Sequence, residues 1–187
     1  MNENGFFMRT IFTVSLIFIF GSFTFSLNNP TFTSQKMTHY IGEEFQDGVV
    51  FFVYLEADGV EHGLVVAKEE QSLTRWQNIA SLVGSSSMAD GKSNSLKINA
   101  SPAITYVHHF GEDWYLPSIN ELGLLWRTRE LVDVNLSTLG QVLSKTVYWS
   151  STEHAALSAL GFDFNGGYSG DPSFKTNHYT VRPIKSF

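Results

Sequence analysis

The sequence predicts a single α+β domain in which strands from both ends of the chain pair in one antiparallel sheet around two central helices. Three observations support this fold class. Apolar runs rich in β-branched and aromatic residues come early, at 49–55 and 64–67, and late, from 147 to 184. Segments with helix-capping residues occupy the middle of the chain. This order is typical of α+β domains rather than of alternating α/β folds.

The first strands and the turn between them form a predicted N-terminal hairpin. Residues 49–55 and 64–67 are the strands, and Ala57-Asp58-Gly59 is the turn signal. Residues 71–77 are expected to form a helical turn that carries Trp76. A loop of small residues, 84–87, then leads into the polar segment 90–94.

The middle of the chain contains the most informative stretch, residues 113–122. Its first residues form a bulky β-favouring run that Pro117 stops. Ser118 and Glu121 then form a capping box, which begins a helix expected to end at about Arg129. An earlier helix is expected from 96 to 109, where Pro102 either restarts or kinks it. Residues 131–143 favour neither helix nor strand.

Three late strands complete the predicted domain, at 147–152, 160–164 and 179–184. Gly-rich turns at 165–167 and 169–172 connect them. Together with the early hairpin, these strands supply the two ends that are expected to share a sheet.

Composition and charge limit the class of protein. The chain has 187 residues, 43% of them hydrophobic, which is enough for one ordinary domain with a real core. It has no cysteine, so the core does without disulfides and a lipoprotein anchor is excluded. The net charge of -6 argues against nucleic acid as a partner, since that affinity comes mainly from Lys and Arg.

The N-terminus has the pattern of an export signal. Arg9 precedes a nearly uncharged apolar segment, so residues 1–26 are predicted to be a signal peptide, with Met8 as an alternative start and cleavage before Leu27. The alternative is an uncleaved membrane anchor, at about 17 residues near the lower limit for spanning. Residues 27–40 are a flexible lead-in, and 41–187 form the domain. The expected location is outside the cell or in the cell envelope, with membrane contact only through an uncleaved signal.

Six segments in order resemble the Lcl C-terminal domain family of bacterial surface domains, whose function is largely unknown and which is related to the major-paralogous-domain proteins. They are residues 47–53, 62–67, 90–94, 113–122, 148–153 and 181–187. The resemblance spans nearly all of the chain after the predicted signal and implies a C-type-lectin-like fold. The chain departs from many members in having no Cys pair. The formylglycine-generating enzymes share that fold, but their chemistry needs cysteine.

A loop-rich face formed by 84–92 and 165–176 is the expected ligand-binding surface, because loops on a rigid scaffold concentrate binding residues. The alternative is an ordinary Gly-rich connection. Trp126 on the helix would stack on a sugar ring or pack in the core, whereas Trp114 and Trp149 are expected in the core. The candidate ligand-binding residues are Tyr168, Phe174, Asp163, Asn165, Asp171 and Trp126.

Metal and catalytic patterns are weak. Asp90 and Asn94 place oxygen ligands as a calcium loop would, but Lys92 stands at the middle ligand position, so the alternative is a turn that caps the next helix. His108 and His109 point different ways on a helix and chelate poorly. Apart from this calcium candidate, no cofactor is expected.

Residues 150–154 place a hydroxyl, a carboxylate and an imidazole close together in the sequence. A catalytic triad is assembled through space, and this sequence spacing does not by itself supply its geometry.

The sequence therefore leaves three functions open. The main one is an exported, non-catalytic binding module of the bacterial surface or envelope that recognises carbohydrate or a protein partner through its loops. The alternative is a structural component of a surface assembly that self-associates as a homo-oligomer. The third is an enzyme with an unrecognised site.

Overall fold

The structure is a computed structural model, and it describes residues 37–187. The predicted signal peptide 1–26 and the lead-in as far as residue 36 lie outside the described residues. At the end of the lead-in, the amide of His39 donates to the Glu61 carboxylate at 2.8 Å.

The helices and strands of the described residues are β1 (Glu44–Phe45), β2 (Gly48–Leu55), β3 (Glu61–Ala67), β4 (Gln71–Arg75), α1 (Gly91–Ser95), α2 (Pro102–His108), α3 (Ile119–Thr138), β5 (Val147–Ala155), β6 (Ser158–Asp163), β7 (Tyr168–Ser169), β8 (Ser173–Phe174), β9 (His178–Val181) and β10 (Ile184–Ser186).

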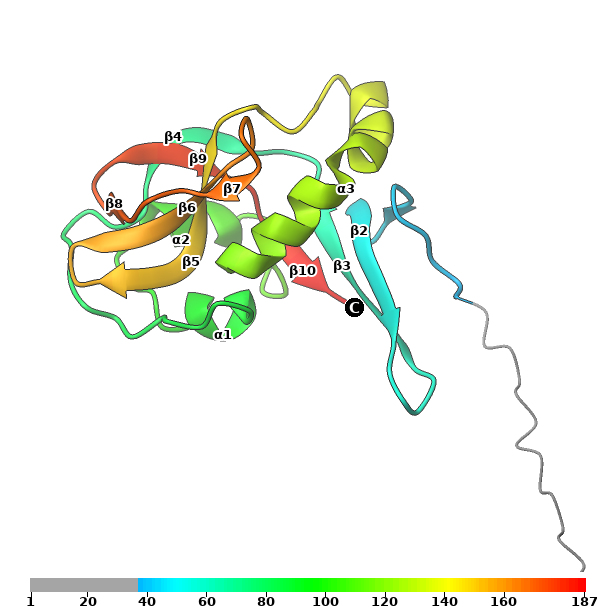
Figure 1. The fold of residues 1–187 in the computed structure, drawn as a ribbon, viewed down its shortest axis with the longest axis horizontal. Coiled ribbons are helices and arrows are strands. Elements are labelled where there is room, and N and C mark those ends of the chain that lie inside the picture. The colour runs from blue at the N-terminus through cyan, green and yellow to red at the C-terminus, as the bar shows by residue number, and fades with distance from the viewer. Residues whose placement is uncertain (1–36) are drawn as a thin grey trace, which may run out of the picture. The chain divides into compact units, whose positions relative to one another are not determined.

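The described residues form an α+β fold with two sheets (Figure 1). The first sheet has the order β1-β2-β3-β10 and is antiparallel throughout. The predicted N-terminal hairpin is confirmed as β2–β3. The predicted pairing of the two ends is also confirmed here, since Ile184 of β10 pairs with Val66 of β3.

The prediction of one shared sheet is wrong for most of the C-terminal strands. They form a second sheet of order β4-β9-β5-β6-β7, in which β8 also pairs with β6 and the β5–β9 pair is parallel. The predicted strand 179–184 divides between the two sheets at Pro183. Because proline has no amide hydrogen to donate to a ladder, β9 ends before it and the chain passes into β10.

Two predicted helical segments differ in the structure. Residues 71–77 do not form a helical turn, because β4 pairs with β9. The strand is irregular, with Leu73 at a φ of +54° and a shift of register between Gln71 and Thr74. The helix expected over 96–109 is shorter, α2, and a separate turn of helix, α1, precedes it. Pro102 restarts the helix, with Ser101 as its N-cap.

The central helix α3 begins as predicted and ends later. The Ser118 hydroxyl accepts from the Glu121 amide, and the Glu121 carboxylate accepts from the Ser118 amide, so the capping box is present. The helix continues past Arg129 because Val132 and Leu136 extend the buried face. Burial raises the pKa of the Glu121 carboxyl, although the amide and hydroxyl of Ser118 and the Tyr115 hydroxyl act in the opposite direction.

Two apolar clusters form the core. One lies between α3 and strands of both sheets and includes Phe51, Leu122, Leu125 and Tyr148. The second is built on three buried tryptophans, Trp76, Trp114 and Trp149, which confirms the core assignment of the last two. Within residues 37–187, no helix has the length and apolar character needed to cross a membrane.

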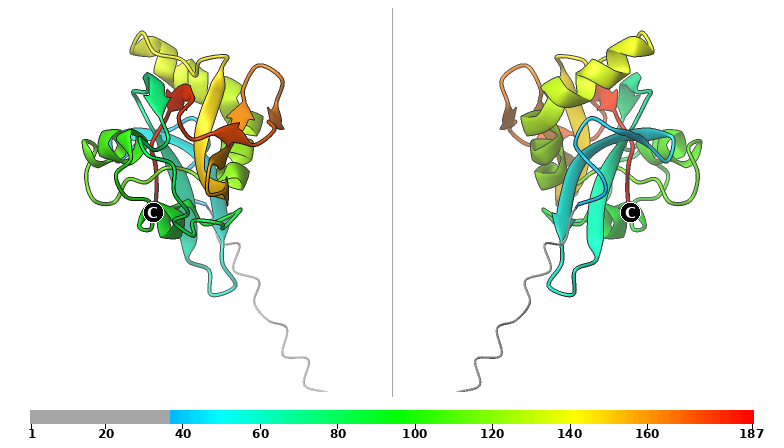
Figure 2. Two further views of the ribbon diagram at one scale, coloured as in Figure 1. Left: turned by 90° about the vertical axis from the view of Figure 1, so that its left-hand side faces the viewer. Right: turned by 90° about the vertical axis from the view of Figure 1, so that its right-hand side faces the viewer.

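The β2–β3 hairpin extends away from the rest of the domain (Figure 2). On its outer part the rings of Phe52, Tyr54 and His62 lie in a row with neighbouring centroids 5.6 Å apart. Phe45 of β1 and Phe187, which follows β10, meet edge to face with ring centroids 5.0 Å apart.

Candidate interaction surface

Four large apolar side chains are exposed on three segments of the chain that Lys175 connects. Ile79 and Leu82 lie in the loop 77–84, Leu157 in the turn between β5 and β6, and Phe174 in β8. They are between 58% and 82% exposed. We call these four residues the end patch. Exposed apolar side chains can mark an interaction surface.

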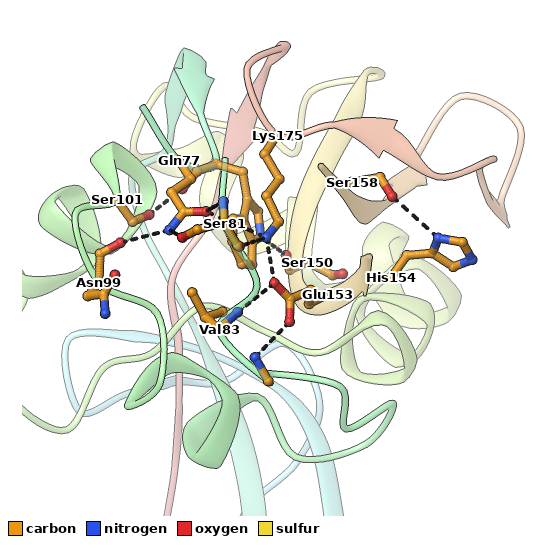
Figure 3. A network of polar contacts seen from close by, with 12 residues as sticks. Gln77, Ser81, Val83, Asn99, Ser101, Ser150, Glu153, His154, Ser158 and Lys175 are labelled. Carbon is orange, nitrogen blue, oxygen red and sulfur yellow. Dashed lines mark hydrogen bonds and ion pairs between the residues drawn. The ribbon is translucent and has the colours of Figure 1, made fainter. Parts of the chain in front are cut away.

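A buried ion pair holds the three segments together (Figure 3). The Lys175 ammonium lies 2.5 Å from the Glu153 carboxylate, and both side chains are almost completely buried. Lys175 follows Phe174 directly, its amide donates to the Leu157 carbonyl, and its ammonium donates to the Ser81 carbonyl. One lysine therefore connects β8, the β5–β6 turn and the loop 77–84.

Glu153 fixes the far end of the same loop. Its two carboxylate oxygens accept from the amides of Val83 and Gly84, at 2.9 and 2.7 Å. At the near end, the Gln77 side chain exchanges hydrogen bonds with Ser81. The Lys175 ammonium also lies over the Trp76 ring, 4.5 Å from its centroid. The loop that carries Ile79 and Leu82 is thus held at both ends by buried polar groups.

The pKa of the Glu153 carboxyl makes the stability of the fold depend on pH. Burial raises the pKa of the Glu153 carboxyl, but the hydrogen bonds from Lys175 and from the Val83 and Gly84 amides outweigh it, so the pKa lies below its ordinary value of 4.5. A carboxyl with a depressed folded-state pKa stabilises the fold above its unfolded pKa and loses that contribution as the pH falls through the folded pKa.

We therefore expect the free energy of unfolding to fall as the pH is lowered from about 4.5, and to fall less in Glu153→Gln. Chemical denaturation at a series of pH values measures both slopes. Glu130→Gln, which removes an exposed carboxyl on α3, is the matched control and should keep the wild-type slope. A Glu153→Gln slope equal to that of the wild type would contradict the assigned role of this carboxyl.

The predicted ligand-binding aromatics are not brought together. Phe174 belongs to the end patch and pairs with Ser158, whereas Tyr168 pairs with Asp163 at the other end of β6. Five residues along a strand span about 16 Å, and an odd separation places side chains on opposite faces. Tyr168 is exposed on its own turn, away from Phe174.

The other predicted ligand-binding residues have local partners. Trp126 is half-buried: the Arg129 guanidinium lies 4.2 Å from its ring centroid, and its indole donates to the Phe164 carbonyl. The Asp163 carboxylate accepts from the Asn165 amide within its own turn. Asn165 and Asp171 are exposed.

The calcium candidates also have partners within the fold. Asp90 is the N-cap of α1 and accepts from the Ser93 amide. Asn94 is buried, and its amide group bonds to both backbone groups of Ser87. Among residues 37–187, no group of three or more His, Cys, Asp or Glu side chains lies close enough to hold a metal ion.

The hydroxyl, carboxylate and imidazole of residues 150–154 do not converge. The Ser150 hydroxyl donates to the Leu160 carbonyl, and Glu153 belongs to the ion pair. His154 is exposed, with its imidazole 3.3 Å from the Ser158 hydroxyl. Because the Glu153 carboxylate is engaged by Lys175, it does not orient the His154 imidazole, and the three groups do not form a triad.

Sequence reasoning identified Phe174 and missed the rest of the end patch. Ile79 and Leu82 follow a segment that was predicted to be helical, and Leu157 lies between predicted strands. The available signal was an apolar residue in each connection together with Lys175, the one lysine or arginine between Lys145 and Arg182.

A second surface is the groove along α2, with a volume of about 700 Å³. Ile98 and Ile104 form an apolar floor. Polar groups surround it, and they come from Asn78, Asn99, Thr105 and His109. Ala100 in its wall has a φ of +48°, which is rare for a residue other than glycine.

Comparison with known proteins gives a likeness of fold. No family model and no curated protein matches the chain. A fimbrial protein from Bacteroides ovatus has a similar structure, with a TM-score of 0.61 at 16% sequence identity. The match covers 81% of this chain and 46% of that protein, so this chain spans less than half the length of its structural relative.

Proposed function

We propose that the protein is a non-catalytic structural subunit of a bacterial surface assembly and that it self-associates through the end patch. The observation that carries this proposal is the set of four exposed apolar side chains on segments fixed by a buried ion pair. A loop that needs to adapt to many ligands gains nothing from such anchoring. A rigid apolar surface, by contrast, loses little conformational entropy when a protein partner covers it.

The likeness to a fimbrial protein supports the surface role. That protein is a fimbrial protein with a similar fold. The export signal predicted at residues 1–26 agrees with such a location. The chain spans under half of that protein, so the likeness extends to one part of it.

Sedimentation equilibrium of the purified protein over a range of concentrations tests the proposal. We expect reversible association of the wild type and at least about tenfold weaker association of Leu82→Ser/Phe174→Ser, because buried apolar anchors dominate interface energies. Leu96→Ser is the matched control, since Leu96 is 86% exposed on another surface. A monomeric wild type at all concentrations would overturn the proposal.

We further propose that the chain is a divergent member of the Lcl C-terminal domain family with a C-type-lectin-like fold. The six ordered sequence segments support this, together with the pairing of β3 and β10 that joins the two ends of the domain. An experimental structure of an established family member tests it. A different strand order in that structure would remove the support.

A second candidate function is binding of a neutral saccharide, and the α2 groove favours it. Amide, hydroxyl and imidazole groups over an apolar floor suit the hydroxyls and the apolar face of a sugar ring. A glycan screen with Asn99→Ala as the variant tests this function. Running the screen with calcium and again with EDTA also tests whether Asp90 and Asn94 take part in binding.

A further inference from the structure

We propose that residues 38–40 form a strap that two carboxylates hold closed at neutral pH and that acid releases. The two carboxylates belong to Glu43, which precedes β1, and to Glu61, the first residue of β3. Release would uncover the aromatic rings on which the strap lies. This device involves neither the end patch nor the α2 groove.

Three consecutive amides of the strap donate to these two carboxylates. The amides of Thr38 and His39 bond to different oxygens of Glu61, at 2.5 and 2.8 Å. The Tyr40 amide bonds to one oxygen of Glu43 at 3.0 Å, and the His39 Nδ1 lies 3.1 Å from the other. All four carboxylate oxygens are therefore engaged. Because a protonated carboxyl offers a donor in place of one acceptor, ionisation of both groups favours the closed strap.

The His39 side chain completes an aromatic cluster. Its ring centroid lies 4.1 Å from that of Phe45 and 5.1 Å from that of Phe187. Phe187 is fixed in turn by Gly63 of β3. These two residues exchange backbone hydrogen bonds, and a Cβ atom at Gly63 would lie 2.3 Å from the Phe187 ring. The strap therefore covers a surface that the fold itself holds in place, and its departure would expose parts of both phenylalanine rings.

The charges around the strap determine how it responds to pH. The Thr38 amide, more than any other group, lowers the pKa of the Glu61 carboxyl from its ordinary value of 4.5, and the charge of the His39 imidazole acts in the same direction. Because this pKa is depressed in the closed state, Glu61 stabilises that state above its ordinary pKa, and the contribution is lost as the pH falls through the lowered one. Protonation of His39 places a positive charge beside both carboxylates, so release requires protonation of the carboxyls themselves.

The other ionisable side chains on the neighbouring elements contact groups outside the strap. Glu44 pairs with Lys68, Glu56 lies near His62, Asp58 accepts from the Val60 amide, and the Lys185 ammonium lies over the Trp114 ring. Asp47 lies in the turn between β1 and β2. The carboxyl group of Phe187 is retained in every variant below. The response to acid is therefore assigned to Glu43 and Glu61.

Chymotrypsin digestion of the full chain at neutral pH tests the role of the two carboxylates. The variant is Glu43→Gln/Glu61→Gln, in which a neutral amide replaces each carboxylate. A protease cuts such a segment in proportion to its open population. We expect cleavage after Tyr40 to be at least about tenfold faster than in the wild type, because hydrogen bonds to charged groups are lost.

The matched control is Glu56→Gln, which removes a carboxyl from the same hairpin that lies near His62 and not on the strap. It should be cut at the wild-type rate. Mass spectrometry identifies the fragment that begins at Ile41 and shows that the rest of the domain stays uncut. Equal rates of cleavage after Tyr40 in the wild type and the double variant would overturn the proposal.

An acid titration of the wild type tests release directly and needs no variant to fold. Nuclear magnetic resonance follows the amide signals of residues 38–40 as the pH is lowered. We expect these signals to move together toward those of an unstructured chain below about pH 4.5 while the signals of β2 and β3 stay in place. In Glu61→Gln, the Thr38 and His39 signals should be displaced already at neutral pH. Strap signals that move only when the whole fold unfolds would overturn the proposed release.

Discussion

Replacement of Lys175 by Met is expected to lower the free energy of unfolding by about 3–5 kcal/mol, because it leaves the Glu153 carboxylate buried without its partner. Lys175 is fully buried and its ammonium bonds to Glu153 and to the Ser81 carbonyl. Methionine has a similar length, so the loss is one of charge and hydrogen bonds rather than of volume. Urea denaturation at neutral pH measures the change.

Two further variants make this prediction specific. Lys145→Met removes an exposed lysine and should change stability by less than about 0.5 kcal/mol. Lys175→Met/Glu153→Met removes both charges and should recover part of the loss, since an apolar pair of similar volume avoids the desolvation cost. A double variant less stable than Lys175→Met would show that the two charges do not act as a pair.

Arg182→Met is expected to destabilise the fold by a similar amount, about 3–5 kcal/mol. The Arg182 guanidinium is fully buried and donates to the carbonyls of Ala67 and Lys68 and to the Glu70 carboxylate. These groups lie at the end of β3 and in the connection to β4, whereas Arg182 directly follows β9. The side chain therefore ties the first sheet to the second.

The control for this prediction is Arg127→Met, which removes an exposed arginine from α3. It should leave the unfolding midpoint within error of the wild type.

Tyr148 gives a second readout for this prediction. Burial, followed by the charge of Glu70, raises the pKa of the Tyr148 hydroxyl, which also donates to the Glu70 carboxylate. Arg182→Met should accordingly perturb the environment of Tyr148, which near-ultraviolet circular dichroism detects. An unchanged midpoint for Arg182→Met would contradict the assigned role.

Local patterns predicted the parts of the fold that local forces determine. The hairpin β2–β3 and the start of α3 at Ser118 follow from alternation, turn residues and capping chemistry within a few residues. The division into two sheets could not be predicted from such local patterns, because strand pairing joins segments that are distant in the sequence. Gln71–Arg75 has no strong period of its own and becomes a strand only through its pairing with β9.

The candidate surface was less predictable for the same reason. Phe174 was recognisable as an aromatic residue in a Gly-rich connection. Leu82 and Leu157 are connected to it through Lys175, whose ammonium donates to the Ser81 carbonyl and whose amide donates to the Leu157 carbonyl. Burial of a lysine depends on a distant partner that composition does not reveal. Tyr168 was grouped with Phe174 by sequence proximity, and the antiparallel arrangement of β7 and β8 on β6 separates them.

The most direct test of the end patch as the site of self-association is the dependence of the weight-average mass on concentration, measured by sedimentation equilibrium. The account predicts a mass that rises reversibly with concentration in the wild type and in Leu96→Ser, and that stays near the monomer value in Leu82→Ser/Phe174→Ser. Association of the double variant with wild-type strength would show that another surface is responsible.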